Sequence, residues 1–64
     1  MSFNKVDSLY DGLQNIINDS QSDVTKFVEG NNSAGTRVRK AMQAVKSLAQ
    51  DIRLEVQDQK NKQF

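Results

Sequence analysis

The chain is interrupted at residues 29–36 by the sequence Glu29-Gly30-Asn31-Asn32-Ser33-Ala34-Gly35-Thr36. Two long amphipathic segments flank this stretch. Glycine tolerates the left-handed backbone that follows many helix ends, so Gly30 predicts the end of the first segment. Asparagine favours turns, and the hydroxyl of Ser33 or Thr36 is suited to cap the next helix. A link this short predicts a turn over 30–34 between antiparallel neighbours.

On both sides of this turn, apolar residues recur at alternating steps of three and four, the spacing of one helix face. The first series is Phe3, Val6, Tyr10, Leu13, Ile17, Ser20, Val24 and Phe27, in which Ser20 is the one polar residue. The second series is Val38, Met42, Val45, Ala49, Ile52 and Val56. Both stripes are widened by further apolar residues, namely Leu9, Ile16, Val28, Ala41 and Leu48. We predict an all-α fold, an antiparallel helical hairpin with heptad seams, in a single domain spanning 1–64. Its helices cover about 3–29 and about 35–60, and a frayed tail covers 61–64.

The first helix has one weak region, at residues 18–22. Its sequence is Asn18-Asp19-Ser20-Gln21-Ser22, and such residues favour caps and turns over helix interiors. A break there, with Ser22 capping a short helix that ends at Glu29, is the alternative. The apolar rhythm runs through this region without a shift, which favours one continuous helix.

The apolar stripes are wider than a single helix-helix contact covers. A 64-residue chain without cysteine has a thin core and no disulfide to support it. We therefore predict a homodimer or a higher even assembly of hairpins, packed as a helical bundle through an isologous interface. A monomeric hairpin of low stability is the alternative. The residues predicted for this interface are Val6, Leu9, Leu13, Ile16, Ile17, Val24, Phe27, Val38, Met42, Val45, Leu48 and Ile52.

The formal net charge of +1 conceals an asymmetry between the halves. Residues 1–29 hold two Lys against five acidic residues, a net charge of −3, whereas residues 30–64 hold seven cations against three acidic residues, a net charge of +4. Opposite charge favours packing the halves side by side. It also makes the second half the place for an anionic partner. The alternative is that both halves are simply solvated helix faces.

Three cations, Arg37, Arg39 and Lys40, fall at the predicted start of the second helix. The helix dipole places about half a positive charge at that end, so each added cation costs about 0.3–1 kcal/mol. A purely structural helix would carry acidic residues there. Exposed N–H groups beside convergent cations instead predict a phosphate site, to which Ser33 and Thr36 add hydroxyl donors.

A second basic feature repeats every seven residues along the same helix. It is a line of cations on one helix face, formed by Arg39, Lys46, Arg53 and Lys60. A parallel line of amides runs beside it, formed by Gln43, Gln50 and Gln57. We expect phosphate contact at Arg39. For Arg53 and Lys60 we expect ordinary pairing with nearby acidic residues, which are Asp51, Glu55 and Asp58.

Several function classes are excluded or disfavoured. The chain has no His and no Cys, and no GxxxxGK phosphate loop, so we predict no enzymatic activity. We expect no cofactor and no metal, and interpret the pairs Asp7/Asp11 and Asp19/Asp23 as surface charges. The longest apolar run is two residues, which excludes a membrane span and a signal-peptide core and favours an intracellular protein.

The second helix also resembles a known family, the chlamydial histone-like proteins, which are small bacterial proteins named after the linker histone. The similarity lies in Ala34-Gly35-Thr36-Arg37-Val38-Arg39-Lys40, in Met42-Gln43 and in Leu48-Ala49-Gln50-Asp51-Ile52-Arg53, with Phe27 and Gly30 at an expected aromatic position and an expected turn glycine. The resemblance implies a hairpin that oligomerises and binds DNA in the cytoplasmic nucleoid. It places the binding residues at Thr36, Arg37, Arg39 and Lys40.

Two hypotheses follow. The first is an architectural protein that binds the phosphates of double-stranded DNA without sequence preference and associates with itself, with no membrane or small-molecule partner. Its predicted DNA-binding residues are Thr36, Arg37, Arg39, Lys40, Gln43 and Lys46. The second is a helical oligomerisation module with a protein partner and no nucleic-acid role.

Overall fold

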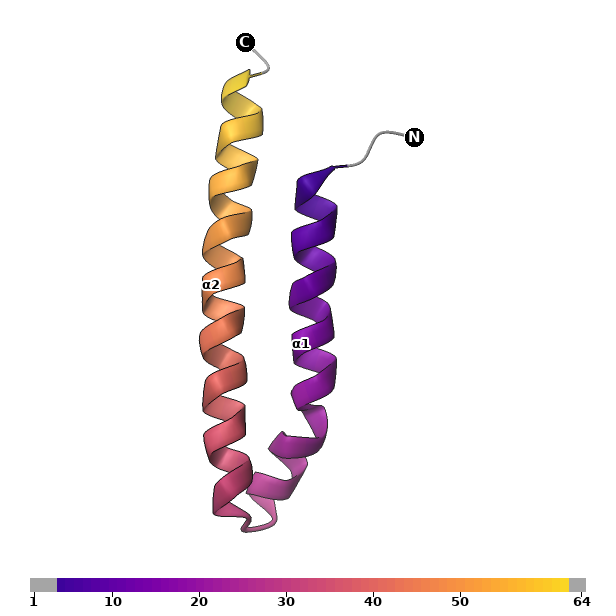
Figure 1. Cartoon of the computed structure of the whole chain (residues 1–64), viewed down its shortest axis with the longest axis vertical. Helices are drawn as coiled ribbons and strands as arrows, with labels where there is room; N and C mark the ends of the chain where they lie inside the picture. The colour runs from indigo at the N-terminus through magenta and orange to yellow at the C-terminus, as the bar shows by residue number, and fades with distance from the viewer. Residues whose placement is uncertain (1–3, 63–64) are drawn as a thin grey trace.

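The computed structural model describes residues 4–62 and consists of two antiparallel helices joined by a tight turn (Figure 1). Helix α1 spans Lys5–Val28 and helix α2 spans Asn32–Lys62. The two helices pack side by side in a hairpin of 52 × 22 × 11 Å, which is one helix thick. The predicted all-α hairpin is confirmed. Neither of these two helices has an apolar stretch long enough to cross a bilayer.

Asn31 serves both helices at the turn. Its backbone N–H donates to the Lys26 carbonyl at 3.0 Å, and the Gly30 N–H donates to the Phe27 carbonyl at 2.9 Å. These two bonds form a Schellman motif, and Gly30 has the left-handed φ of +107° that it requires. The side-chain Oδ1 of Asn31 accepts the Ala34 N–H at 3.1 Å and so caps α2. Neither Ser33 nor Thr36 is the cap.

The helix bounds differ from the sequence-based ones at each end. Because Asn31 is the cap, α2 begins at Asn32 and not near residue 35, and the turn is correspondingly shorter than 30–34. Helix α1 begins at Lys5 because the Asn4 side chain accepts the Val6 N–H at 2.9 Å. At the other end, Asn61 and Lys62 are helical and not frayed. Phe3, Gln63 and Phe64 lie outside the described residues.

Helix α1 is continuous but bends toward α2 before the turn (Figure 1). The hydroxyl of Ser20 donates to the Ile17 carbonyl at 2.9 Å, and the hydroxyl of Thr25 donates to the Gln21 carbonyl at 3.3 Å. Such bonds from Ser and Thr to the preceding turn bend helices. The predicted weak region is therefore a bend and not a break.

The packed seam consists of two rows on each helix, and it differs from the predicted one. On α1 the buried and half-buried residues of the seam are Val6, Leu9, Leu13, Ile16, Ser20 and Asp23. On α2 they are Ala34, Val38, Ala41, Val45, Leu48, Ile52, Glu55 and Gln59. The residues taken to widen the stripes, such as Leu9 and Leu48, thus lie between the helices. The exposed residues include six that were placed in the predicted seam, namely Tyr10, Ile17, Val24, Phe27, Met42 and Val56.

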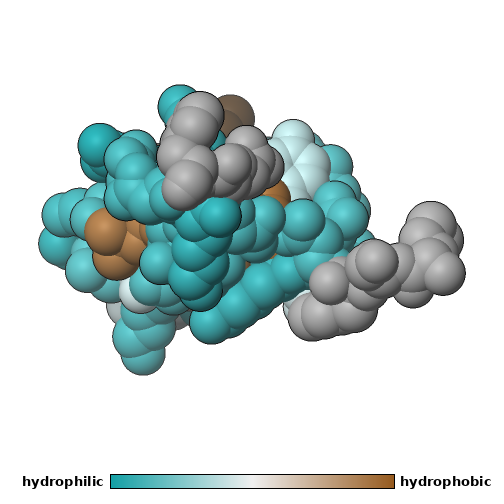
Figure 2. Space-filling model, turned by 90° about the horizontal axis from the view of Figure 1, so that it is seen from above, coloured by the Kyte–Doolittle hydropathy of each residue, from teal (hydrophilic) through white to brown (hydrophobic). Residues whose placement is uncertain are grey.

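The core is thin. Among residues 4–62, Ala34 and Ser20 alone are buried, at 0% and 6% exposure. Figure 2, which looks down on the hairpin from above, shows apolar surface reaching the exterior between polar surfaces. Of the twelve residues predicted for the oligomer interface, Ile17, Val24, Phe27 and Met42 are exposed, and the other eight are half-buried within the hairpin.

Candidate nucleic-acid interface

The three predicted phosphate-binding cations do not lie at the start of α2. Because the helix begins at Asn32, Arg37 stands in its second turn and Lys40 in its third. The field of the helix dipole fades within the first turn. The three cations therefore do not crowd an electron-poor helix end as predicted, and their role depends on where their side chains lie.

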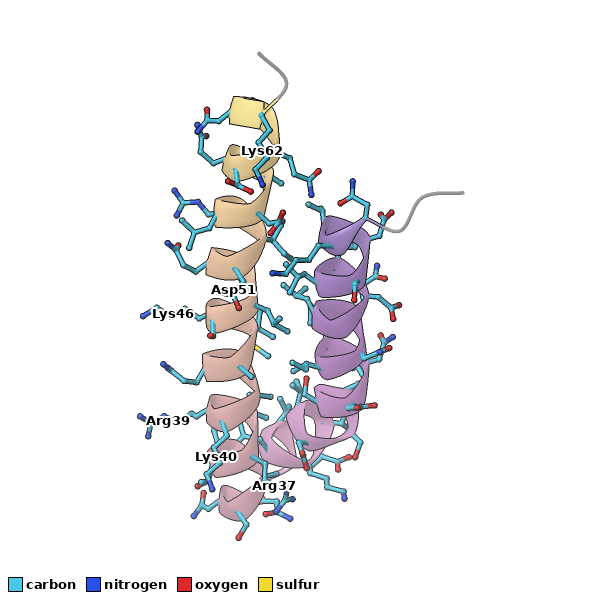
Figure 3. The ribbon with its side chains drawn as sticks, turned by 45° about the horizontal axis from the view of Figure 1, so that its top comes forward. Arg37, Arg39, Lys40, Lys46, Asp51 and Lys62 are labelled. Carbon is cyan, nitrogen blue, oxygen red and sulfur yellow. The ribbon has the colours of Figure 1, made fainter. Side chains whose placement is uncertain are left out.

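Arg37 forms an ion pair within the hairpin. Its Nε donates to Oδ1 of Asp23 at 2.9 Å, and this ion pair joins α2 to α1. Arg37 and Arg39 are two residues apart on one helix, so they project about 200° from each other. Figure 3 shows Arg39 extending away from α1, whereas Arg37 lies near the turn. The structure therefore does not bring the three cations together.

A different set of cations lies along the outer side of α2. We call it the basic edge, and it consists of Arg39, Lys40, Lys46, Arg53 and Lys60, all exposed. None of the five takes part in an ion pair among residues 4–62. The five cations occupy two of the three outward rows of α2, and none of the three rows carries a carboxylate between Thr36 and Asn61. Figure 3 shows Arg39 and Lys46 pointing to the same side, away from α1.

Polar side chains lie between these cations. A shallow hollow on the surface of α2 is lined by Thr36, Arg39, Lys40 and Gln43. The next hollow along the helix is lined by Gln43, Lys46, Ser47, Gln50 and Asp51. Five of the six predicted DNA-binding residues, all except Arg37, therefore line two adjacent hollows. Hydroxyl and amide donors there are suited to bind the oxygens of an extended anion.

The sequence-based expectation for Arg53 and Lys60 is wrong. Neither pairs with an acidic residue within 4–62, and Arg53 donates instead to Oε1 of Gln50 at 3.3 Å. Two of the three acidic residues expected as partners pair with other cations, because Lys5 pairs with Glu55 at 3.7 Å and Lys62 pairs with Asp58 at 3.0 Å.

The hydrogen bond and the charge of Asp58 raise the pKa of Lys62. Lys62 therefore belongs to a local ion pair and not to the basic edge. The seven-residue spacing already groups Arg53 and Lys60 with Arg39 and Lys46, but sequence reasoning missed that both stay without an acidic partner among residues 4–62. The absence of acidic residues from the outward rows was the available signal.

The outer side of α1 has the opposite character. Its outward rows carry Asp7 and Asp11 and no cation. No group of three or more potential metal ligands occurs in the described part of the chain. The hairpin is thus a flat body with a basic edge on α2 and acidic residues on the outer side of α1.

Comparison with protein families identifies what the chain is similar to. The family model described as histone H1-like protein Hc1 matches residues 7–62, which include nearly all of both helices. No curated protein and no solved structure matches the chain.

Proposed function

Because the chain belongs to the histone H1-like Hc1 family, we propose that it is a DNA-binding nucleoid protein whose basic edge contacts the phosphates of double-stranded DNA. The observation that carries this proposal is the composition of the outer side of α2, where five cations lie on two of three outward rows that hold no carboxylate. The description of the family as histone H1-like supports DNA binding. The absence of enzymatic activity stays a prediction, made from a chain that lacks His and Cys.

The length of the basic edge suits a duplex. Arg39 and Lys60 are separated by 21 residues, or about 32 Å along a helix at 1.5 Å per residue. One turn of B-form DNA is about 34 Å long. A hairpin lying along the duplex therefore offers cations over about one turn. Asp7 and Asp11 are repelled by phosphates, which orients α2 toward the DNA and α1 away from it.

The proposed contacts specify position and not sequence. Lys and Arg side chains on a straight, exposed helix edge reach phosphates, which carry no base information. Gln43 and Thr36 add hydrogen-bond donors to phosphate or sugar oxygens. Tyr10 and Phe27 lie on α1, away from the basic edge, so they are not placed to stack on bases. We propose binding without sequence preference.

The test is the salt dependence of DNA affinity. Fluorescence anisotropy on a labelled duplex of mixed sequence gives the slope of log affinity against log salt for wild type and for R39A/K40A/K46A. Each phosphate contact contributes about 0.9 to this slope, so we expect the triple variant to lose about 2.7 per bound protomer.

R37A is the matched control, because Arg37 is a cation of the same helix that is held by Asp23. It should leave the slope nearly unchanged. Circular dichroism checks that every variant remains helical. A triple variant with the wild-type slope, or an R37A variant with an equal loss, rules out the basic edge as the DNA contact.

Self-association is the second part of the proposal. A hairpin with two buried residues among those described, and with many exposed apolar side chains, is supported best by packing against further copies. Several linked basic edges would then gain affinity through avidity.

A protein-interaction module without a DNA role is the alternative function, and the exposed apolar side chains favour it. A gel shift on unrelated duplexes separates the two, because that module shifts none of them at low or moderate salt.

A further inference from the structure

One broad face of the hairpin is apolar and exposed. We call it the apolar face, and it is formed by Tyr10, Ile17, Val24, Phe27, Met42 and Val56. Five of these residues directly follow a residue of one seam row: Tyr10, Ile17 and Val24 come after Leu9, Ile16 and Asp23, and Met42 and Val56 come after Ala41 and Glu55. The sixth, Phe27, ends the other seam row of α1, which begins at Val6. In an antiparallel helix pair, the positions that directly follow this seam row lie on the same side of the seam in both helices. The exposed apolar side chains of α1 and α2 therefore share one face.

The opposite face of the hairpin is polar. The ion pairs between Arg37 and Asp23 and between Lys5 and Glu55 join the helices there. Both cations stand one residue before the seam row, which places them on the side away from the apolar face. The two faces thus differ in chemistry, and the apolar face is the one whose burial lowers the free energy.

The occupant that fits the apolar face is a second copy of the chain. The hairpin is one helix thick, with an 11 Å short dimension, and it has no cysteine with which to form a disulfide. Chains of this size need oligomerisation or another support of similar strength. Two hairpins stacked on their apolar faces form a four-helix bundle, and the stacked faces become its core.

Charge distinguishes the two symmetric ways of stacking. The row of α2 that borders the apolar face carries four cations, which are Arg39, Lys46, Arg53 and Lys60. The corresponding row of α1 carries Asp7, Gln14, Gln21 and Val28. Stacking α2 on the partner's α2 brings four cations beside four others. Stacking α2 on the partner's α1 brings them beside a row with no cation and one carboxylate.

We infer that two copies stack on their apolar faces about a two-fold axis parallel to the helices, with each α1 on the partner's α2, so that the dimer presents its two basic edges on opposite sides and bridges two DNA duplexes. The bridging part rests on the proposed function. The other symmetry, with its axis across the helices, places both basic edges on one side and serves a single duplex.

Chemical cross-linking tests the symmetry, since the chain has no cysteine of its own. The variants are Y10C and V24C, each treated with a short bismaleimide. With the axis parallel to the helices, every residue of the apolar face is level with its own copy, so both variants form covalent dimers. With the axis across the helices, the partner hairpin runs in the opposite direction, so a residue near one end of the dimer has its copy near the other end. The two positions are about 21 Å apart along α1, so at most one variant links.

The control is N18C, on the outer side of α1, which stays monomeric on denaturing gels. Sedimentation equilibrium shows whether each variant retains the wild-type mass. Linking at both positions but not at residue 18 supports the inference. Linking at one position alone, linking at neither, or a monomeric wild-type protein overturns it.

A bridging assay then separates this inference from the proposed function. An immobilised duplex, the wild-type protein and a second, fluorescent duplex are combined, and retention of fluorescence reports bridging. The proposed dimer retains the second duplex. Binding of the first duplex without retention of the second overturns the bridging geometry and leaves the DNA-binding function standing. Cross-linking at both positions without any DNA binding overturns the function and leaves the dimer symmetry standing.

Discussion

Two glycines show how differently one residue type is used in the hairpin. A Cβ at Gly12 would lie 3.9 Å from Cδ1 of Leu48, an ordinary contact. A Cβ at Gly35 would lie 2.6 Å from Cδ1 of Phe27, which is far too close. Gly35 is therefore the residue that allows the Phe27 ring to cover the start of α2, whereas Gly12 is tolerated without a steric need.

We expect G12A to raise the free energy of unfolding by about 0.5–1 kcal/mol, because alanine is the better helix former. G35A gains the same helix term, but displacing a packed ring costs about 1–3 kcal/mol, so we expect a net loss of about 1 kcal/mol. Urea denaturation at fixed protein concentration measures both. In an F27A background the steric conflict is gone, and G35A should become stabilising. A stabilising G35A in the wild-type background would contradict this interpretation.

At the scale of the element, Ser20 explains why α1 bends without breaking. Its side chain is buried in the seam, and its hydroxyl is satisfied by the Ile17 carbonyl at 2.9 Å. A small residue lets the helices approach, and the bond to the preceding turn bends α1 toward α2.

We expect S20L to lower the free energy of unfolding by about 1–3 kcal/mol, since the larger side chain overpacks the seam. The matched control is S22L, at an exposed position of the same helix, which should change stability by less than about 0.5 kcal/mol. Thermal denaturation followed by circular dichroism compares the two. Should S20L melt at or above the wild-type temperature, the seam has spare room and this account of Ser20 fails.

The sequence predicts both helices and their antiparallel order, because the apolar rhythm and Gly30 are local signals. It does not predict which rows pack. Each apolar stripe is three rows wide, and one row of the true seam includes Asp23 on α1 and Glu55 on α2. A carboxylate argues against burial until its partner is known, and the partners Arg37 and Lys5 come from the other helix. The same long-range pairing removes Arg37 from the predicted DNA site, and no local pattern reveals it.

At the scale of the whole molecule, stability should depend on protein concentration. A protein that folds and associates together becomes more stable as its concentration rises. We therefore expect the melting temperature to increase over a tenfold rise in concentration. I17E, which places a charge on the apolar face, should abolish this dependence. L54E changes an exposed apolar residue outside that face and should retain it. A wild-type melting temperature independent of concentration argues against self-association.

Asn31 connects the two helices without any free linker residue after it, since its N–H caps the end of α1 and its side chain caps the start of α2. The turn therefore fixes the rotation of α2 about its own axis relative to α1. A single residue inserted beside it would rotate α2 by about 100° relative to α1. That rotation would carry the cations of the outer surface onto a broad side of the hairpin and expose the leucines and isoleucines of the seam. The direction in which the basic edge faces is therefore set by one asparagine that, in the proposed complex, does not contact DNA.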